Sequence, residues 1–372
     1  MQLTVFQKLP IKGKDIGWAS CIPLLSKANR ALARYDGVLQ GMIYPEVLLS
    51  PLTMQEAVLS SRIEGTQADL TEVLGFEAGK EVTDEPRRED IREIINYRCA
   101  MNAAVKEMEQ RPLSLNLLRR LHFILFDSVR GHNKERGDFR KVQNWIGAEG
   151  SKMEDAYFIP PDPLHLEEYL DNFEKYIHAD ELDPLVQLAV VHAQFEIIHP
   201  FMDGNGRLGR MLVPLFLYQK RILSRPTFYL SSYLERHQEA YIGGLRDIEE
   251  PRGWNRWVLF FLKALTEQAE EDLEKARAIF ELYEELKKQV LNLTHSQYAI
   301  PLLDAMFSRP IFRINDLLRM GTFPSEPSRQ TVVGLIGKLA ENKVLRVLQK
   351  GGGRRARRFS LQELIDICEG KR

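Results

Sequence analysis

Residues of several chemical kinds gather in the stretch 199–210, whose sequence is HPFMDGNGRLGR. His199 titrates near neutral pH, so it can accept a proton from an attacking hydroxyl. Asp203 offers a hard oxygen ligand of the kind that Mg²⁺ prefers. Arg207 and Arg210 lie three positions apart, a spacing that suits the binding of two phosphate groups. A base, a metal ligand and two arginines in so short a stretch predict a site of phosphoryl or nucleotidyl transfer.

The elements on either side of this stretch must place it at a junction between two helices. Apolar residues recur every three or four positions over residues 185–198 and again over 211–218, which predicts a helix before and a helix after. Between them, Gly204 and Gly206 let the backbone turn with positive φ and approach a ligand closely. The amides that follow Gly204 then open the second helix, where unpaired N–H groups and the helix dipole bind phosphate.

Two other interpretations of the same stretch are weaker. Residues 204–209 match the GxGxxG pattern of dinucleotide-binding proteins, but that pattern should follow a strand and precede an acidic residue by about 20 positions. Here a predicted helix comes first, and Tyr229 stands at the acidic position.

His192, Glu196 and His199 share one helical face and so could hold a metal. In an apolar run, however, His192 is more often a core residue.

The stretch 199–210 resembles the signature of the Fic family, HPFx[D/E]GNGRxxR, with every fixed position filled, and the resemblance extends over roughly residues 50–265. It implies that His199 deprotonates a Ser, Thr or Tyr hydroxyl of a target protein and that Asp203 holds Mg²⁺. The hydroxyl would attack the α-phosphate of ATP and release pyrophosphate. Relatives that transfer phosphate instead depart from the motif at its last positions, and this chain keeps Arg210. The implied nucleotide contacts are Gly204, Asn205, Gly206, Arg207, Leu208, Gly209 and Arg210.

A second motif lies nearer the N-terminus. Residues 60–65, SSRIEG, resemble the inhibitory motif [S/T]xxxE[G/N] of self-restrained Fic proteins, with Ser60, Glu64 and Gly65 at its fixed positions. A serine four residues before a glutamate is common on solvated helices. The motif therefore indicates inhibition only because the complete Fic signature is also present. The resemblance implies a charge-assisted pair between Glu64 and Arg210, which keeps the arginine from the γ-phosphate of ATP.

The segment 137–163 combines Gly, Pro and aromatic residues, which predicts a loop or a short hairpin. The resemblance implies that this segment is the flap of the family, which presents the target hydroxyl by strand-to-strand pairing. Tyr157, Phe158 and Ile159 are then the candidates for the pairing edge. An ordinary surface loop is the alternative.

Two tyrosines occur where relatives line the adenine pocket, Tyr233 and Tyr241. The family often has a Tyr-Tyr pair where this chain has Tyr241 followed by Ile242. Either tyrosine could equally be a core residue, so the sequence leaves the adenine-stacking side chain open.

The C-terminal part changes character from about residue 291. Helical patterns over residues 298–307, 313–320 and 328–342 are followed by two strand-like stretches, 344–349 and 354–361, around a triple-glycine turn. Three helices and a β-hairpin in this order predict a winged helix, with residues 328–338 in its recognition helix.

The wing of this domain, residues 350–358, carries five positive charges and no negative one. Such a patch could meet a phosphate backbone of DNA. The alternative is a protein-interaction or dimer-positioning module whose basic hairpin is simply solvated. Both interpretations stay open.

The composition of the whole chain limits the other classes. It has 372 residues, 44% hydrophobic and 28% charged, with a formal net charge of −1, so the molecule as a whole is no electrostatic binder of nucleic acid. Its three cysteines lie far apart, which argues against a disulfide framework or a zinc site. No apolar run approaches the roughly 20 residues that span a bilayer, and the first residues lack the pattern of a signal peptide. We therefore expect a cytoplasmic protein without membrane partners.

Together these features predict a mainly α-helical protein, a Fic-type helical bundle with a short β-hairpin flap and a small α+β winged-helix domain. The expected parts are an N-terminal helical region (1–110), a catalytic core (111–288) and the winged helix (289–372). The expected function is a protein adenylyltransferase that uses ATP and Mg²⁺, is restrained by Glu64, and is compatible with a homodimer. Three alternatives remain: a DNA-binding regulator with a nucleotide-sensing core, another nucleotide donor, and removal of AMP from a modified target.

Overall fold

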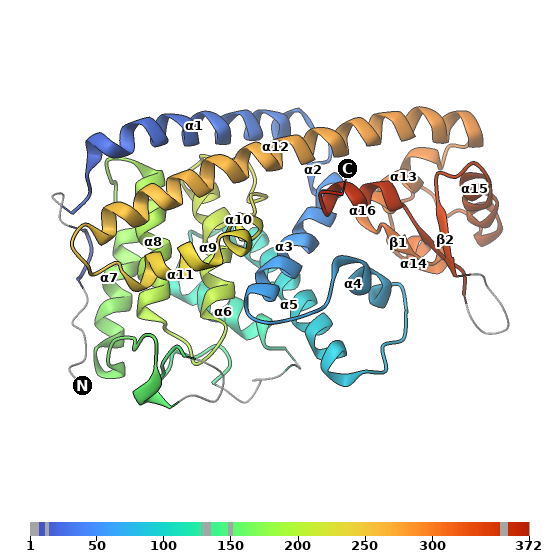
Figure 1. Cartoon of the computed structure of the whole chain (residues 1–372). Coiled ribbons are helices and arrows are strands. Elements are labelled where there is room, and N and C mark those ends of the chain that lie inside the picture. The colour runs from blue at the N-terminus through green and yellow to red at the C-terminus, as the bar shows by residue number, and fades with distance from the viewer. Residues whose placement is uncertain are drawn as a thin grey trace. The chain divides into compact units, whose positions relative to one another are not determined.

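The computed structural model describes residues 7–11, 15–127, 129, 135–147, 152–349 and 356–371. Helices make up most of it, and the named strands in these residues form one small sheet (Figure 1). The mainly α-helical fold expected from the sequence is therefore confirmed. The chain divides into two compact units. The first contains Met1–Asp36, Leu59–Gly65 and Asn96–Glu270, and the second contains Gly37–Val58, Thr66–Ile95 and Glu271–Arg372.

The first unit carries the predicted catalytic stretch. Its own helices are α6 (Leu115–Leu125), α7 (Leu166–His178), α8 (Pro184–Ile198), α9 (Asn205–Gln219), α10 (Ser231–Arg236) and α11 (Gln238–Arg246), with the short 3₁₀ helices η1 (Met153–Asp155) and η2 (Pro163–His165). Four longer helices contribute residues to both units: α1 (Trp18–Gly41), α3 (Ser50–Ile63), α5 (Glu85–Met108) and α12 (Gly253–Thr294).

Helix α8 is the central helix of the first unit. Every residue from Leu185 to Ile198 is buried, as expected for a helix that is apolar all round and covered on every face. Its start is specified locally, because the Asp183 carboxylate accepts hydrogen bonds from the amides of Leu185 and Val186, and Pro184 occupies the first helical position. Helices α7 and α9 pack against α8. Residues 199–210 thus begin where a buried helix ends.

The helices predicted before and after residues 199–210 are confirmed as α8 and α9. Further along the chain, α12 extends from Gly253 to Thr294. No strand precedes the GxGxxG match, since residues 184–198 are helical, so the dinucleotide-binding interpretation is wrong.

The second unit contains the C-terminal elements. Its elements are α2 (Pro45–Leu48), α4 (Leu70–Glu77), α13 (Ala299–Ser308), β1 (Ile311–Phe312), α14 (Ile314–Arg319), α15 (Arg329–Glu341), β2 (Arg346–Gln349), β3 (Arg358–Ser360) and α16 (Gln362–Cys368). The sheet is antiparallel in the order β1-β3-β2, with Phe312 opposite Phe359 and Val347 also opposite Phe359.

The order of these elements is the one expected for a winged helix. Three helices precede the β2–β3 pair, and α15 buries four apolar side chains: Val332, Leu335, Ile336 and Leu339. The sequence did not predict β1, because two residues are too few to show a period, nor α16 after the hairpin. Of the basic wing, residues 350–355 lie outside the described part of the chain.

The three-part division at residues 110 and 288 stays a prediction. Within the described ranges, no helix is long and apolar enough to cross a membrane.

Candidate active site

His199 stands at the end of α8 in the left-handed conformation, with φ 49° and ψ 59°. This conformation ends the helix and turns the chain away from it. The ring Nδ1 lies 3.3 Å from the carbonyl oxygen of Glu196, and because that oxygen can only accept, Nδ1 carries the proton. Nε2 is then the acceptor that a base needs. Burial lowers the pKa of His199 to about 4, so the ring is neutral at pH 7 and able to take a proton.

Arg140 holds the loop that follows His199. Its buried guanidinium donates from Nε to the carbonyl oxygen of His199 at 3.0 Å and from Nη2 to that of Pro161 at 2.6 Å. Its backbone amide donates to the carbonyl oxygen of Pro200 at 2.9 Å. Burial lowers the pKa of Arg140 to about 10, which leaves it charged at neutral pH. The sequence did not single out Arg140, whose only signal was its place within the Gly/Pro/aromatic segment 137–163.

Two further side chains, Asn205 and His122, hold the loop through contacts with Phe201. The side chain of Asn205 accepts from the amide of Phe201 at 2.9 Å and donates to its carbonyl oxygen at 2.8 Å. The ring of His122, another residue that the sequence did not single out, stacks on Phe201 with 4.1 Å between centroids. Its Nε2 lies 3.2 Å from the carbonyl oxygen of Asp203, and its Nδ1 accepts from the amide of Gly137 at 2.8 Å. These contacts fix the conformation of the loop on both sides of Phe201.

Gly204 and Gly206 are needed for different reasons. Gly204 has φ +75°, and a Cβ at that position would lie 2.6 Å from the Phe126 ring. A Cβ on Gly206 would lie 2.2 Å from Oε1 of Glu64. The Glu64 carboxylate therefore lies against the first turn of α9, where a helix N-terminus favours an anion.

Glu64 and Arg210, predicted to pair, form an ion pair with 2.6 Å between Oε1 and Nη2. Arg210 also donates to Ser60, from Nε to Oγ at 2.8 Å and from Nη2 to the carbonyl oxygen at 2.9 Å. The side chain of Arg210 is 1% exposed and that of Glu64 is 39% exposed. Burial would raise the pKa of Glu64, yet Arg210 and Arg207 hold it below its ordinary value. Burial would lower the pKa of Arg210, yet Glu64 holds it above its ordinary value.

Arg207 and Asp203 lie side by side at the loop, with 3.9 Å between Nη2 and Oδ1. The guanidinium of Arg207 lies over the Phe126 ring at 5.1 Å. The amide of Gly204 donates to Oδ1 of Asp203 at 2.7 Å, and the carboxylate is 43% exposed. A partly exposed carboxylate beside a helix N-terminus fits Mg²⁺, which keeps several waters and shares the phosphates of its nucleotide.

The remaining predicted nucleotide contacts lie deeper. Leu208 is fully buried, and its amide donates to the carbonyl oxygen of Gly204 at 3.1 Å in the first turn of α9. The carbonyl oxygen of Gly209 accepts from His192 at 2.9 Å. Tyr233 is buried, and its ring stacks on His237. Tyr241 is 4% exposed and bonded to His192. Their assignment to the nucleotide stays a prediction.

The metal-centre interpretation of His192, Glu196 and His199 is not supported. In the part of the chain that the structure describes, no group of three or more His, Cys, Asp or Glu side chains could hold a metal. Both ring nitrogens of His192 bond to protein groups instead. Glu196 is buried, burial raises its pKa to about 7, and Oε1 of its side chain accepts no hydrogen bond from the described residues.

The predicted flap contains one antiparallel bridge, between Ile146 and Phe158. The amide of Ile146 donates to the carbonyl oxygen of Phe158 at 2.9 Å, and that of Tyr157 donates to Ile146 at 2.8 Å. Tyr157 is 67% exposed, while Phe158 and Ile159 are half-buried. Residues 148–151, between the paired positions, lie outside the described residues.

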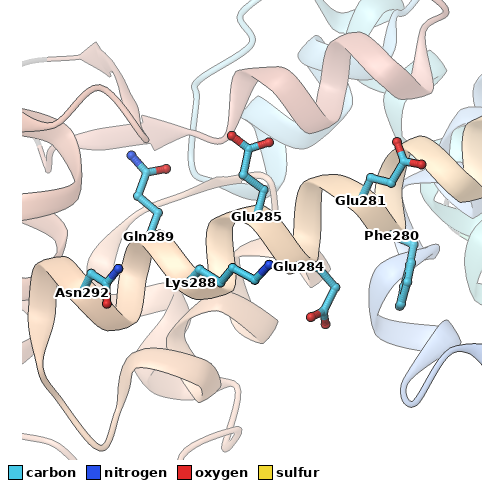
Figure 2. A pocket seen from close by; sticks show the side chains of 7 residues that line it. All are labelled: Phe280, Glu281, Glu284, Glu285, Lys288, Gln289 and Asn292. Atoms are coloured by element: carbon cyan, nitrogen blue, oxygen red, sulfur yellow. The ribbon is translucent and has the colours of Figure 1, made fainter.

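A surface hollow elsewhere holds none of these residues. It lies in the second unit, along the C-terminal half of α12, and its lining side chains all project from that one helix (Figure 2). They include Glu281, Glu284 and Glu285, so an acidic, open surface lines it.

Comparison with known proteins places the chain in a family. The family model described as Fic/DOC family N-terminal matches residues 22–106, and the model described as Fic/DOC family matches residues 112–217. Together they match just over half of the chain. The fold and the loop geometry define a Fic-type helical protein, and the chain belongs to the Fic/DOC family.

Two curated relatives show how far the likeness extends. A probable protein adenylyltransferase of Aquifex aeolicus is 28% identical over 212 residues, which cover 55% of this chain and 58% of the relative. The protein adenylyltransferase Fic of Drosophila grimshawi is 27% identical over 122 residues, which cover 30% of this chain and 23% of the relative. The chain thus spans less than two thirds of either relative.

Solved structures share the fold. A Fic family protein from Desulfovibrio desulfuricans G20 has a TM-score of 0.57 at 19% identity, and the match covers 95% of this chain and 98% of that one. A Fic domain containing signaling protein from Bacteroides thetaiotaomicron has a TM-score of 0.54 at 18% identity, and the match covers 68% of this chain and 97% of that one.

Proposed function

We propose that this protein is an adenylyltransferase that moves AMP from ATP to a Ser, Thr or Tyr hydroxyl of a target protein. The observation that carries the proposal is the arrangement around the first turn of α9. There a neutral His199, the carboxylate of Asp203 and the guanidinium of Arg207 surround a helix N-terminus that already attracts the Glu64 carboxylate. The curated relatives named protein adenylyltransferases agree with it.

The proposed reaction uses these groups in order. Nε2 of His199 accepts the proton of the target hydroxyl, and the hydroxyl oxygen forms a bond to the α-phosphorus of ATP. The bond between that phosphorus and the bridging oxygen of pyrophosphate breaks, and pyrophosphate leaves. Arg207 and the amides at the start of α9 stabilise the negative charge on the phosphates. Mg²⁺, held by Asp203, would neutralise further phosphate charge.

Glu64 restrains this reaction in our proposal. Its carboxylate lies against Gly206, in the region where the phosphates would bind, and it occupies Nη2 of Arg210. With Arg210 engaged, the γ-phosphate lacks its partner, so ATP binds without the pose that exposes the α-phosphorus to attack. Tyr157 and the strand pairing near Phe158 would align the target hydroxyl, as the exposed position of Tyr157 allows.

The test uses ATP labelled at the α-phosphate or, separately, at the γ-phosphate. Each label is incubated with Mg²⁺, a cell lysate and one of four proteins: the parent, Glu64→Gly, Glu64→Gly/His199→Ala, and Glu81→Gly as a matched control at an exposed loop carboxylate. We expect protein labelling from the α-phosphate only, at least tenfold stronger in Glu64→Gly than in the parent or Glu81→Gly. The His199→Ala change should abolish it.

The other outcomes are distinguishable. Label from the γ-phosphate would mean phosphotransfer. No label from either position, in folded protein that binds ATP, would favour another donor or a nucleotide-sensing role. Equal labelling by the parent and Glu64→Gly would remove the restraint assigned to Glu64.

A further inference from the structure

His122, on α6, is a buried polar residue to which the proposed reaction gives no task. It is 1% exposed, and both nitrogens of its ring meet backbone groups. Nδ1 accepts a hydrogen bond from the amide of Gly137 at 2.8 Å. Because an amide N–H can only donate, Nδ1 carries no proton, and the ring proton is on Nε2. Nε2 therefore donates to the carbonyl oxygen of Asp203, 3.2 Å away.

The bond from His122 helps to fix the peptide group between Asp203 and Gly204. The carbonyl oxygen of this peptide accepts from His122, and its N–H donates to Oδ1 of Asp203 at 2.7 Å. A rotation of the peptide would break both bonds. The direction of the Asp203 carboxylate thus depends on the peptide group that His122 holds.

The end of α6 also confines Gly204. This residue has φ +75°, and a Cβ on it would lie 2.6 Å from the ring of Phe126, the residue that follows α6. The Phe126 ring packs against His122 with 4.8 Å between ring centroids, and the guanidinium of Arg207 lies over it at 5.1 Å. His122 and Phe126 together therefore contact Asp203, the turn at Gly204 and Arg207.

On its other side, His122 holds the start of the flap segment. Gly137, the first residue of that segment, has φ +82°, and a Cβ on it would lie 3.3 Å from the carbonyl oxygen of Arg119 on α6. A glycine there lets the chain come close enough to α6 for its amide to reach the His122 ring. The carbonyl oxygen of Gly137 accepts from Nε of Arg119 at 2.9 Å. One imidazole ring thus joins the flap segment to the residue proposed to bind the metal.

We propose that His122 is a positioning residue that directs the Asp203 carboxylate toward Mg²⁺ and ties it to the start of the flap segment. The inference rests on the proposed function, in which Asp203 holds Mg²⁺. It assigns a separate task to each ring nitrogen: Nε2 holds the residue that binds the metal, and Nδ1 holds the segment that docks the target. A ring that only filled space would need neither nitrogen.

The test measures how strongly Mg²⁺ tightens the binding of ADP, so its readout does not depend on transfer. Calorimetry gives the affinity for ADP in Mg²⁺ and in EDTA, in the Glu64→Gly background, and the ratio of the two affinities is the Mg²⁺ effect. Asp203→Ala defines the baseline without the metal ligand. We expect His122→Asn to lower the ratio roughly tenfold toward that baseline, because a residue that orients a metal ligand contributes about that factor to metal affinity.

Two variants separate the tasks of the two nitrogens. The amide of an asparagine lies about where Nδ1 lies, so His122→Asn keeps an acceptor for Gly137 and loses the donor to Asp203. The amide of a glutamine reaches the place of Nε2, so His122→Gln keeps that donor and loses the acceptor. His122→Gln should therefore keep the Mg²⁺ effect. Hydrogen exchange at the Gly137 amide should be faster in His122→Gln than in His122→Asn.

Gln187→Leu is the matched control. Gln187 is also buried, and it donates to two backbone carbonyl oxygens, those of Tyr176 and Ala179, near the start of α8. Its loss should leave the Mg²⁺ effect unchanged. Thermal melting identifies the folded variants. If His122→Asn does not fold, His122→Phe, which keeps a ring beside Phe201 and lacks both nitrogens, should lower the ratio by the same factor.

The results separate the two proposals. If Asp203→Ala lowers the ratio while His122→Asn and His122→Phe keep it, the positioning role is wrong and the proposed function stands. Equal losses in His122→Asn and His122→Gln would mean that the ring acts through packing alone, which also overturns the inference. If Asp203→Ala keeps the ratio, Asp203 does not hold Mg²⁺ and the inference falls with that assignment, whereas AMP transfer is tested separately by the labelled ATP.

Discussion

At the scale of single residues, burial sets the charge of the site. Glu196 and His199 lie three residues apart at the end of α8, and burial shifts their pKa values in opposite directions, to about 7 and about 4. Both shifts favour the uncharged form, because a low-dielectric interior disfavours charge of either sign. The site therefore combines a neutral base with a carboxyl that ionises near physiological pH.

We predict that Glu196→Gln changes the pH dependence of stability. The folded pKa of about 7 lies above the ordinary value of a glutamate, about 4.5, so the unfolded chain loses the proton first as pH rises. The carboxyl thus destabilises the parent progressively from about pH 4.5 to pH 7, by on the order of 3 kcal/mol at most. Urea unfolding at pH 5 and pH 8 should show Glu196→Gln gaining stability relative to the parent at the higher pH. An equal difference at both values would contradict the shift.

At the scale of elements, one arginine joins two segments to the end of α8. Arg140 donates to the carbonyl oxygens of Ile198 and His199 at the helix end and to that of Pro161 at the end of the flap segment. Carbonyl oxygens at a helix end have no partner within the helix, so a buried cation there satisfies several at once. The position of His199 thus depends on a residue 59 positions earlier.

We predict that Arg140→Met lowers the free energy of unfolding by about 2–4 kcal/mol, because the buried carbonyl oxygens lose their donor. Arg119→Met is the matched control, since the exposed Arg119 pairs with Asp138 at the surface and should contribute at most about 1 kcal/mol. Urea unfolding followed by tryptophan fluorescence measures both. A loss no larger than that of the control would show that the loop holds itself without Arg140.

At the scale of the whole molecule, the net charge is close to zero, but one segment is strongly basic. The net charge is −1, while residues 350–358 carry five positive charges. In the second unit, Val333 on α15 is 40% exposed and Val347 and Leu348 on β2 are each 41% exposed. Exposed apolar side chains favour a protein contact, and basic ones favour phosphate, so the predicted winged helix has features that suit both kinds of partner.

A salt titration of duplex DNA binding decides between these partners. If the five wing charges contact phosphates, the affinity should fall roughly a hundredfold or more between 50 and 200 mM salt, and Arg354→Ala/Arg355→Ala should reduce the logarithmic salt slope by about 2. Lys106→Ala/Arg111→Ala removes the same charge from an exposed part of the first unit and should leave the slope unchanged. Fluorescence anisotropy of a labelled duplex measures this. A flat response would exclude DNA and leave the protein contact.

Much of the fold was predictable because its signals are local. The apolar periods of α8, α9 and α12 and the order of helices and strands near the C-terminus are visible in the sequence, and the structure contains them. The two-residue strand β1 was not predictable, since it exists only through its pairing with β3. The contact between Tyr241 and His192 was not predictable either, because position along the chain carries no information on the direction of a side chain.

The sequence by itself determined the family, the loop between α8 and α9 and the candidate base, because these depend on residues within twelve positions of one another. Only the tertiary structure decided the partners that no motif indicates. Arg140 reaches His199 across 59 positions, and Tyr241 reaches His192 across 49. Spacing along a chain specifies neighbours within a helix or turn, whereas contacts between helices depend on how their buried faces pack.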